Sequence, residues 1–144
     1  MSVPDTKPLE GSIRAHFSRL DRIRLSTDFQ NVFAARRTVV GRLMVIWVGT
    51  ESEESRLRLG VVASKRTFRR AVDRNRAKRL LREAFRLNKA SISLKCDLVI
   101  VARRRILGVK CADVERELVW LVNKIQHKLA VTKVDKKSPN KDRE

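Results

Sequence analysis

The chain has 144 residues, 42% of them hydrophobic, which fits a single domain with a real core and excludes disorder throughout. It carries 34 Lys and Arg against 16 Asp and Glu, a formal net charge of +18, so a polyanion is the expected partner. Because no apolar run approaches about 18 residues and the amino terminus has no hydrophobic signal region, we expect a cytoplasmic protein with no membrane segment.

The first predicted elements follow an amino-terminal arm. Residues 1–24 include two prolines and no hydrophobic period, which predicts a flexible basic arm. The sequence from Thr27 to Gln30 has the Thr-x-x-Gln form of a capping box. Phe29, Val32 and Phe33 have helical spacing, which predicts a short helix to about Ala35. The β-branched, apolar runs 38–40, 43–48 and 58–64 predict three strands.

The next segment, 64–86, is both densely cationic and helically periodic. Asp73 is the expected amino-terminal cap of this helix. At about 100° per residue, one stripe is apolar and should be buried; it contains Ala77, Leu80, Leu81, Ala84 and Phe85. The opposite face is polar and contains Asn75, Arg79, Arg82 and Arg86, flanked by Arg76 and Lys78. Like charges at this spacing destabilise an isolated helix, so an external polyanion should supply the negative charge. A merely solvated face is the alternative.

Two more elements complete the predicted fold. Residues 97–102 form a continuous apolar run that predicts a buried central strand. From Asp113 to about Leu129, apolar residues recur at helical spacing, and residues 132–144 predict a disordered polar tail. The apolar positions of that helix are Val114, Leu118, Leu121, Val122, Ile125 and Leu129. The element order predicts an α+β sandwich, α-β-β-β-α-β-α, with one sheet packed by helices and one domain over 25–131.

The sequence offers little protein-borne chemistry. No Ser-His-Asp or Cys-His set has supporting spacing, and a two-histidine ribonuclease built from His16 and His127 is the catalytic alternative. Cys96 and Cys111 stand apart from other potential metal ligands, so we expect free thiols, with a disulfide between them as the alternative. We expect no catalytic residue and no metal site in the protein.

The type of polyanion follows from the basic helix and the aromatic residues. The basic helix lacks the Trp- and Leu-rich face of a membrane-surface helix, which favours nucleic acid. Phe29 and Phe33 share a helix face close in sequence to Trp47, and single-stranded bases stack on such rings. Ordinary core packing of these three rings is the alternative. A DNA-reading helix is disfavoured, because Asn75 is almost the only side chain there suited to reading base edges.

The sequence resembles the protein subunit of bacterial ribonuclease P. The resemblance rests on Arg58-Leu-Gly-Val-Val-Ala-Ser-Lys-Arg66 and on Arg70-Ala-Val-Asp-Arg-Asn-Arg-Ala-Lys-Arg-Leu-Leu-Arg-Glu-Ala-Phe-Arg86, with its specific Arg-Asn-Arg-x-Lys-Arg core. Residues 28–33 look like the family's first helix, and 97–103 look like its strand after the long helix. The Arg-Asn-Arg-x-Lys-Arg run argues against the main rival, a non-enzymatic RNA-binding protein such as a ribosomal protein.

The resemblance implies a tRNA-processing endonuclease whose chemistry is carried by an RNA subunit. That catalytic RNA, with Mg²⁺ held by the RNA and the substrate, removes the 5′ leader of precursor tRNA. One protein per RNA would bind the catalytic RNA and the leader, broaden substrate use and lower the Mg²⁺ requirement. The implied fold has a left-handed βαβ crossover, against the usual right-handed preference.

The same resemblance assigns residues to the two RNAs. The catalytic RNA would contact Lys65, Arg66, Arg69, Arg70, Arg74, Asn75, Arg76, Lys78, Arg79, Arg82 and Arg86. The leader would contact Phe29, Phe33, Trp47 and Ser64.

Overall fold

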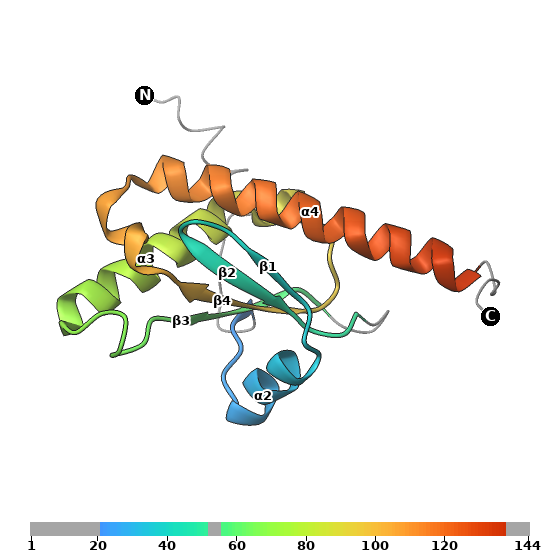
Figure 1. Cartoon of the computed structure of the whole chain (residues 1–144), viewed down its shortest axis with the longest axis horizontal. Helices are drawn as coiled ribbons and strands as arrows, with labels where there is room; N and C mark the ends of the chain where they lie inside the picture. Colours follow the sequence, from blue (N-terminus) through green and yellow to red (C-terminus); the bar gives the residue numbers. More distant parts are fainter. Residues whose placement is uncertain (1–20, 52–55, 138–144) are drawn as a thin grey trace, which may run out of the picture.

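The computed structural model describes residues 21–51 and 56–137, which form helices and strands in the predicted order (Figure 1). Two short 3-10 segments, residues 89–91 and 104–108, are not predicted by the sequence pattern. The elements are α2 (Ser26–Ala34), β1 (Thr38–Val40), β2 (Met44–Val48), β3 (Arg58–Val62), α3 (Ala71–Asn88), η2 (Lys89–Ser91), β4 (Asp97–Ala102), η3 (Arg104–Gly108) and α4 (Cys111–Lys137). The α+β prediction is confirmed.

The four strands form one mixed sheet in the order β1-β2-β4-β3. β2 pairs antiparallel with β1 and with β4, and in the second ladder Ile46 lies opposite Ile100. β3 and β4 are parallel neighbours, with Gly60 opposite Val99. The connection between these parallel strands contains α3, which is the crossover that the family resemblance implies. The left-handedness of this crossover stays a prediction.

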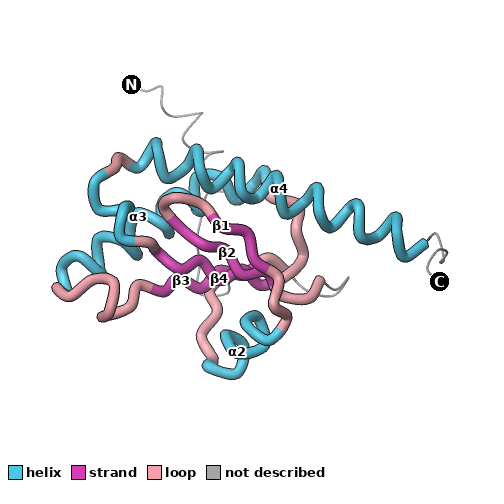
Figure 2. The backbone as a smooth tube through the Cα atoms, in the orientation of Figure 1, coloured by secondary structure: helices cyan, strands magenta, loops and turns pink. Residues whose placement is uncertain are grey.

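Helices lie on both faces of the sheet (Figures 1 and 2). Side chains alternate along a strand, so Met44 and Ile46 of β2 face one side while Trp47 faces the other. The first side carries the main core, where Leu98 and Ile100 of β4 meet the buried sides of α3 and α4. The second side carries a small cluster under α2. The predicted packing of one sheet by helices is therefore correct, and it extends to both faces.

The predicted apolar stripes of both long helices are buried. In α3, Ala77, Leu81, Ala84 and Phe85 are at most 1% exposed, and Leu80 packs against them half-buried. In α4, all the predicted positions up to Ile125 are buried, and Leu129 is half-buried against the same core. Periodicity therefore predicts the core-facing side of each long helix correctly.

The predicted helix caps are wrong. α2 begins at Ser26 with Leu25 as its cap residue, and no side chain caps it, so Thr27 does not form the predicted capping box. α3 begins at Ala71 with Arg70 as its cap residue, which places Asp73 in the first turn. A carboxylate in the first turn still interacts favourably with the helix dipole. Asp73 therefore suits this end of the helix without capping it.

The third strand and the last helix end at different residues from those predicted. The third strand ends at Val62 rather than Ser64, because the chain turns there toward α3. α4 continues to Lys137, past the predicted end near Leu129 and into the predicted tail. Residues 138–144, the rest of that tail, lie outside the described residues.

Order begins before Leu25, because residues 21–23 contact β3 of the sheet and Lys89 of η2. Ile23 N–H donates to the Leu59 carbonyl at 2.9 Å, beside a parallel bridge between Arg22 and Leu59. Asp21 is 2% exposed, and its carboxylate accepts from Arg56 at 2.9 Å and from Lys89 at 2.8 Å. A buried carboxylate needs such partners. The end of the predicted arm is thus structural, whereas residues 1–20, with His16, lie outside the described residues.

Candidate nucleic-acid interface

α3 presents its cations on the side opposite its buried stripe. Asn75, Arg76 and Arg79 are exposed, while Lys78, Arg82 and Arg86 are half-buried. The loop before the helix adds further exposed cations, Lys65, Arg66, Arg69 and Arg70. Arg74, in the first turn, is half-buried. The structure therefore places the predicted catalytic-RNA-binding residues on one helix and on the loop that precedes it. Some of these residues are exposed and others are half-buried.

Arg74 anchors this loop to the helix. Its guanidinium donates to the backbone carbonyls of Phe68 at 2.9 Å and Arg69 at 3.1 Å. The Phe68 ring is 2% exposed in the main core. Ser64 closes the loop from the other end, since its hydroxyl hydrogen-bonds the Thr67 hydroxyl at 3.0 Å and accepts from the Thr67 amide at 3.2 Å. These contacts hold the loop cations in place, a role that the sequence did not indicate.

Two arginines of α3 have distinct electrostatic surroundings. Arg86 pairs with Glu83 at 2.6 Å, and this hydrogen bond lowers the pKa of Glu83 and raises that of Arg86. Burial, together with the nearby charge of Arg22, lowers the pKa of Arg82. Arg86 is therefore partly neutralised within the protein. Arg76 and Arg79 are the more exposed cations of the helix.

The predicted leader-binding aromatics lie together on the other face of the sheet. The Phe33 ring of α2 meets the Trp47 ring of β2 edge to face, with centroids 5.0 Å apart. Phe29 lies over β3, where a Cβ on Gly60 would sit 2.6 Å from the ring atom Cε1. All three rings are half-buried and pack beside Ile23, Val32 and Val99. The packing and stacking interpretations of these rings are therefore compatible.

Ser64 lies beyond the carboxyl end of β3, the strand that supports Phe29. Its side chain is exposed and is engaged with Thr67. The structure thus places Ser64 in the loop that leads to the α3 cations and not among the three rings. Its predicted contact with the leader stays a prediction.

An ion-pair network fixes α2 against the sheet. Arg58 of β3 makes two hydrogen bonds to Asp97 of β4, at 2.9 and 2.7 Å, and lies 3.4 Å from Asp28 of α2. The hydrogen bond to Asp97 is the main cause of the raised pKa of Arg58. Opposite charges at the first residues of two predicted strands were the only sequence signal for this network. It positions the helix that carries Phe29 and Phe33.

Other chemistry is sparse in the described part of the chain. Cys96 and Cys111 are free thiols, as predicted. Among residues 21–51 and 56–137, no three His, Cys, Asp or Glu side chains group so as to hold a metal ion. A search of the same residues finds no helix that is both long and apolar enough to cross a membrane.

Comparison with known proteins identifies similar chains and folds. Residues 17–126 match the family model described as Ribonuclease P. The "Ribonuclease P protein component" of Coxiella burnetii is 39% identical over 72% of this chain and 81% of the relative, and that of Acinetobacter baylyi is 36% identical over 76% and 83%. The RNase P protein structure from Staphylococcus aureus has 28% identity and a TM-score of 0.64, covering 73% of this chain and 94% of the other. The one from Thermotoga maritima has 28% identity and a TM-score of 0.63, covering 72% and 96%.

Proposed function

Since the chain belongs to the ribonuclease P protein family, we propose that it is the RNA-binding subunit of an enzyme that removes the 5′ leader of precursor tRNA. The exposed cations of α3 and its leading loop bind the catalytic RNA. The rings of Phe29, Phe33 and Trp47 hold the single-stranded leader. The cleavage chemistry belongs to the RNA subunit and its Mg²⁺, and the protein contributes substrate affinity.

The observation that carries this proposal is the placement of two chemically different surfaces, on α3 and under α2, on opposite sides of one sheet. Arg76 and Arg79 on α3 can neutralise phosphates without reading bases. Half-buried aromatic rings under α2 suit a strand of variable sequence, because every base has a face that can stack. A protein that holds both RNAs favours precursor tRNA, which has a leader, over mature tRNA, which has none.

We also propose that the protein lowers the Mg²⁺ requirement and broadens substrate use. Cations on α3 neutralise phosphate charge that Mg²⁺ would otherwise have to neutralise. Stacking on aromatic rings tolerates many leader sequences. We further propose one protein per catalytic RNA and a cytoplasmic site of action.

The first test is multiple-turnover cleavage of a 5′-extended precursor tRNA by a bacterial ribonuclease P RNA at low Mg²⁺, with and without the protein. We expect strong rescue by the protein. Tight RNA binding without rescue would instead indicate a structural RNA-binding protein.

A variant pair tests the assignment of α3. Arg79→Ala should weaken binding to the catalytic RNA and reduce the slope of log affinity against log salt by about 0.7–0.9, the value for one phosphate contact. Lys95→Ala is the matched control, because Lys95 is also exposed but lies between η2 and β4, outside α3 and the loop that precedes it. Equal effects of the two changes would contradict the assignment.

A further inference from the structure

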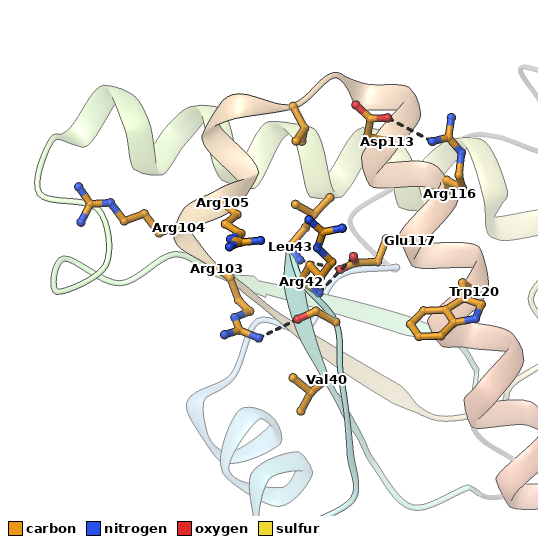
Figure 3. A pocket seen from close by; sticks show the side chains of 12 residues that line it. Val40, Arg42, Leu43, Arg103, Arg104, Arg105, Asp113, Arg116, Glu117 and Trp120 are labelled. Carbon is orange, nitrogen blue, oxygen red and sulfur yellow. Dashed lines mark hydrogen bonds and ion pairs between the residues drawn. The ribbon is translucent and has the colours of Figure 1, made fainter.

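A basic groove, separate from the cations of α3, lies apart from the aromatic rings of α2 and β2. Three segments line it: the turn between β1 and β2, the chain that follows β4, and the first half of α4 (Figure 3). Its volume is about 980 Å³. The family resemblance assigned none of its residues to RNA.

The walls of the groove are held by specific hydrogen bonds. The Glu117 carboxylate of α4 accepts the backbone N–H of Arg42 at 3.2 Å and of Leu43 at 2.7 Å. Arg103 donates from its guanidinium to the Gly41 carbonyl at 2.8 Å and from its amide to the Leu43 carbonyl at 2.9 Å. These bonds tie the turn to both α4 and the end of β4. The groove therefore has a fixed shape.

The groove has more positive charge than its own carboxylates can balance. Asp113 pairs with Arg116 at 3.2 Å, and Glu117 is occupied by the two turn amides. Arg42, Arg104 and Arg105 are exposed and form no ion pair with any residue that the structure describes. Concentrated positive charge of this kind raises the local concentration of anions.

An aromatic side chain completes the lining. Trp120 of α4 is 55% exposed, and Lys124 Nζ lies 4.6 Å from its ring centroid. Figure 3 shows the indole on the α4 wall, beyond Glu117 from the arginines that follow β4. An exposed indole that lines the same groove as several guanidinium groups provides a stacking surface for a base, and the guanidinium groups provide cations for neighbouring phosphates.

The position of the groove identifies the RNA that would reach it. β3 and β4 are parallel, so their carboxyl ends meet at one edge of the sheet, where the chain leads into α3 and η3 respectively. α3 packs against η3, and Arg104 extends away from Arg42 toward the side where α3 begins (Figure 3). The aromatic cluster of α2 lies on the opposite face of the sheet. An RNA lying along the cations of α3 therefore reaches the groove more directly than a leader held under α2.

We propose that this groove is a further RNA-binding site and that it takes a single-stranded segment of the same catalytic RNA that α3 binds. A base of that segment stacks on Trp120, and neighbouring phosphates contact Arg42, Arg104 and Arg105. This assignment rests on the proposed function, because it assumes that α3 binds the catalytic RNA.

The two tryptophans of the chain, Trp47 and Trp120, allow a direct test. In Trp47→Phe, Trp120 is the sole tryptophan, and we expect its fluorescence to be quenched to saturation by a bacterial ribonuclease P RNA. Arg104→Ala/Arg105→Ala in the same background should weaken this binding at least about tenfold and reduce the salt slope by about 1.4–1.8, the value for two phosphates. Lys95→Ala should leave both nearly unchanged.

A second readout uses the chain with both tryptophans. Footprinting of the catalytic RNA should show one segment protected by the unmodified protein and exposed with Arg104→Ala/Arg105→Ala, while the segment protected by α3 stays protected. Tight RNA binding without quenching of Trp120 and without such a segment would overturn this inference and leave the proposed function intact. Failure of the unmodified protein to bind the RNA would overturn the proposed function itself. Quenching by anionic vesicles or a poly-glutamate peptide but not by RNA would overturn the choice of occupant.

Discussion

The two faces of the sheet differ in how completely they are covered. On one face, α3 and α4 bury a continuous core that includes Met44, Ile100 and Phe85 with essentially no exposure. On the other face, the nine-residue α2 covers a cluster that, among the residues that the structure describes, has three buried members, Ile23, Val32 and Val99. Both faces use the same strands. The closed face holds most of the buried core, and the thinly covered face leaves its aromatic rings half-exposed.

Because of this contrast, one strand can contribute both to the core and to the proposed leader-binding surface. In β2, Ile46 points into the closed core, and its neighbour Trp47 points toward α2. Alternation separates the two roles by a single residue. A substitution should therefore act on stability or on leader binding according to the face its side chain occupies.

The largest expected effect is on the closed face. Phe85→Ala removes a fully buried ring from α3 and should lower the free energy of unfolding by about 3–5 kcal/mol. Urea denaturation measures the loss. A loss below about 1 kcal/mol would show that the closed face is not the main source of stability.

Gly60→Ala tests how tightly α2 sits on the open face. The added methyl group would lie 2.6 Å from Phe29 Cε1 and 3.4 Å from Ile23, so we expect a loss of about 1–3 kcal/mol from overpacking. Leader affinity should fall as well, because Phe29 must move. Gly108→Ala is the control, since its added methyl group meets nothing within 4 Å. Equal stability of the two variants would contradict the close packing of Phe29 on β3.

Phe33→Ala should separate binding from stability. Loss of one stacking ring, worth about 1–3 kcal/mol, should reduce the preference for precursor over mature tRNA by roughly tenfold. The stability loss should be smaller than for Phe85→Ala, because Phe33 is only half-buried. Phe33→Leu keeps the apolar volume without the aromatic face and serves as the control. Full discrimination by Phe33→Ala in holoenzyme binding assays would show that the ring only packs.

The smallest effect concerns the thiols. Burial raises the pKa of Cys96 to about 12, far above the ordinary value of about 8.5. The unfolded chain therefore ionises first as pH rises, so the contribution of Cys96 to stability is present below about pH 8.5 and declines between that pH and about 12. Native alkylation at pH 8 should modify Cys111, which is partly exposed, before Cys96. Faster modification of Cys96, measured by mass spectrometry, would mean that the closed face opens readily.

The sequence predicted features that depend on local periodicity. The buried stripe through Ala77 and Phe85 follows from helical spacing alone, and so does the run from Val114 to Ile125 in α4. The sequence groups the three aromatic residues because Phe29 and Phe33 are spaced to share one helix face and Trp47 lies on a predicted strand close by in the sequence. Each of these signals is contained in a single element or in two neighbouring ones.

Features that depend on distant partners were missed. Asp21 is buried because Arg56 and Lys89, far away in the sequence, surround its carboxylate. The requirement for Gly60 appears only when Phe29 is placed above it. The caps were wrong because a Thr-x-x-Gln or Asp pattern does not show which amide a side chain reaches. Long-range electrostatics and packing decide these positions.

The parallel pairing of β3 and β4 has a consequence for how the molecule folds. Arg58 lies opposite Asp97, so the chain must close a long loop before this ladder can form, and contacts so far apart in sequence slow folding. The loop being closed includes α3, so the position of its arginines relative to this parallel pair is fixed only when the ladder has formed. On the proposed function, catalytic RNA recognises this folded geometry and not the unfolded chain, so by mass action its binding should raise the free energy of unfolding.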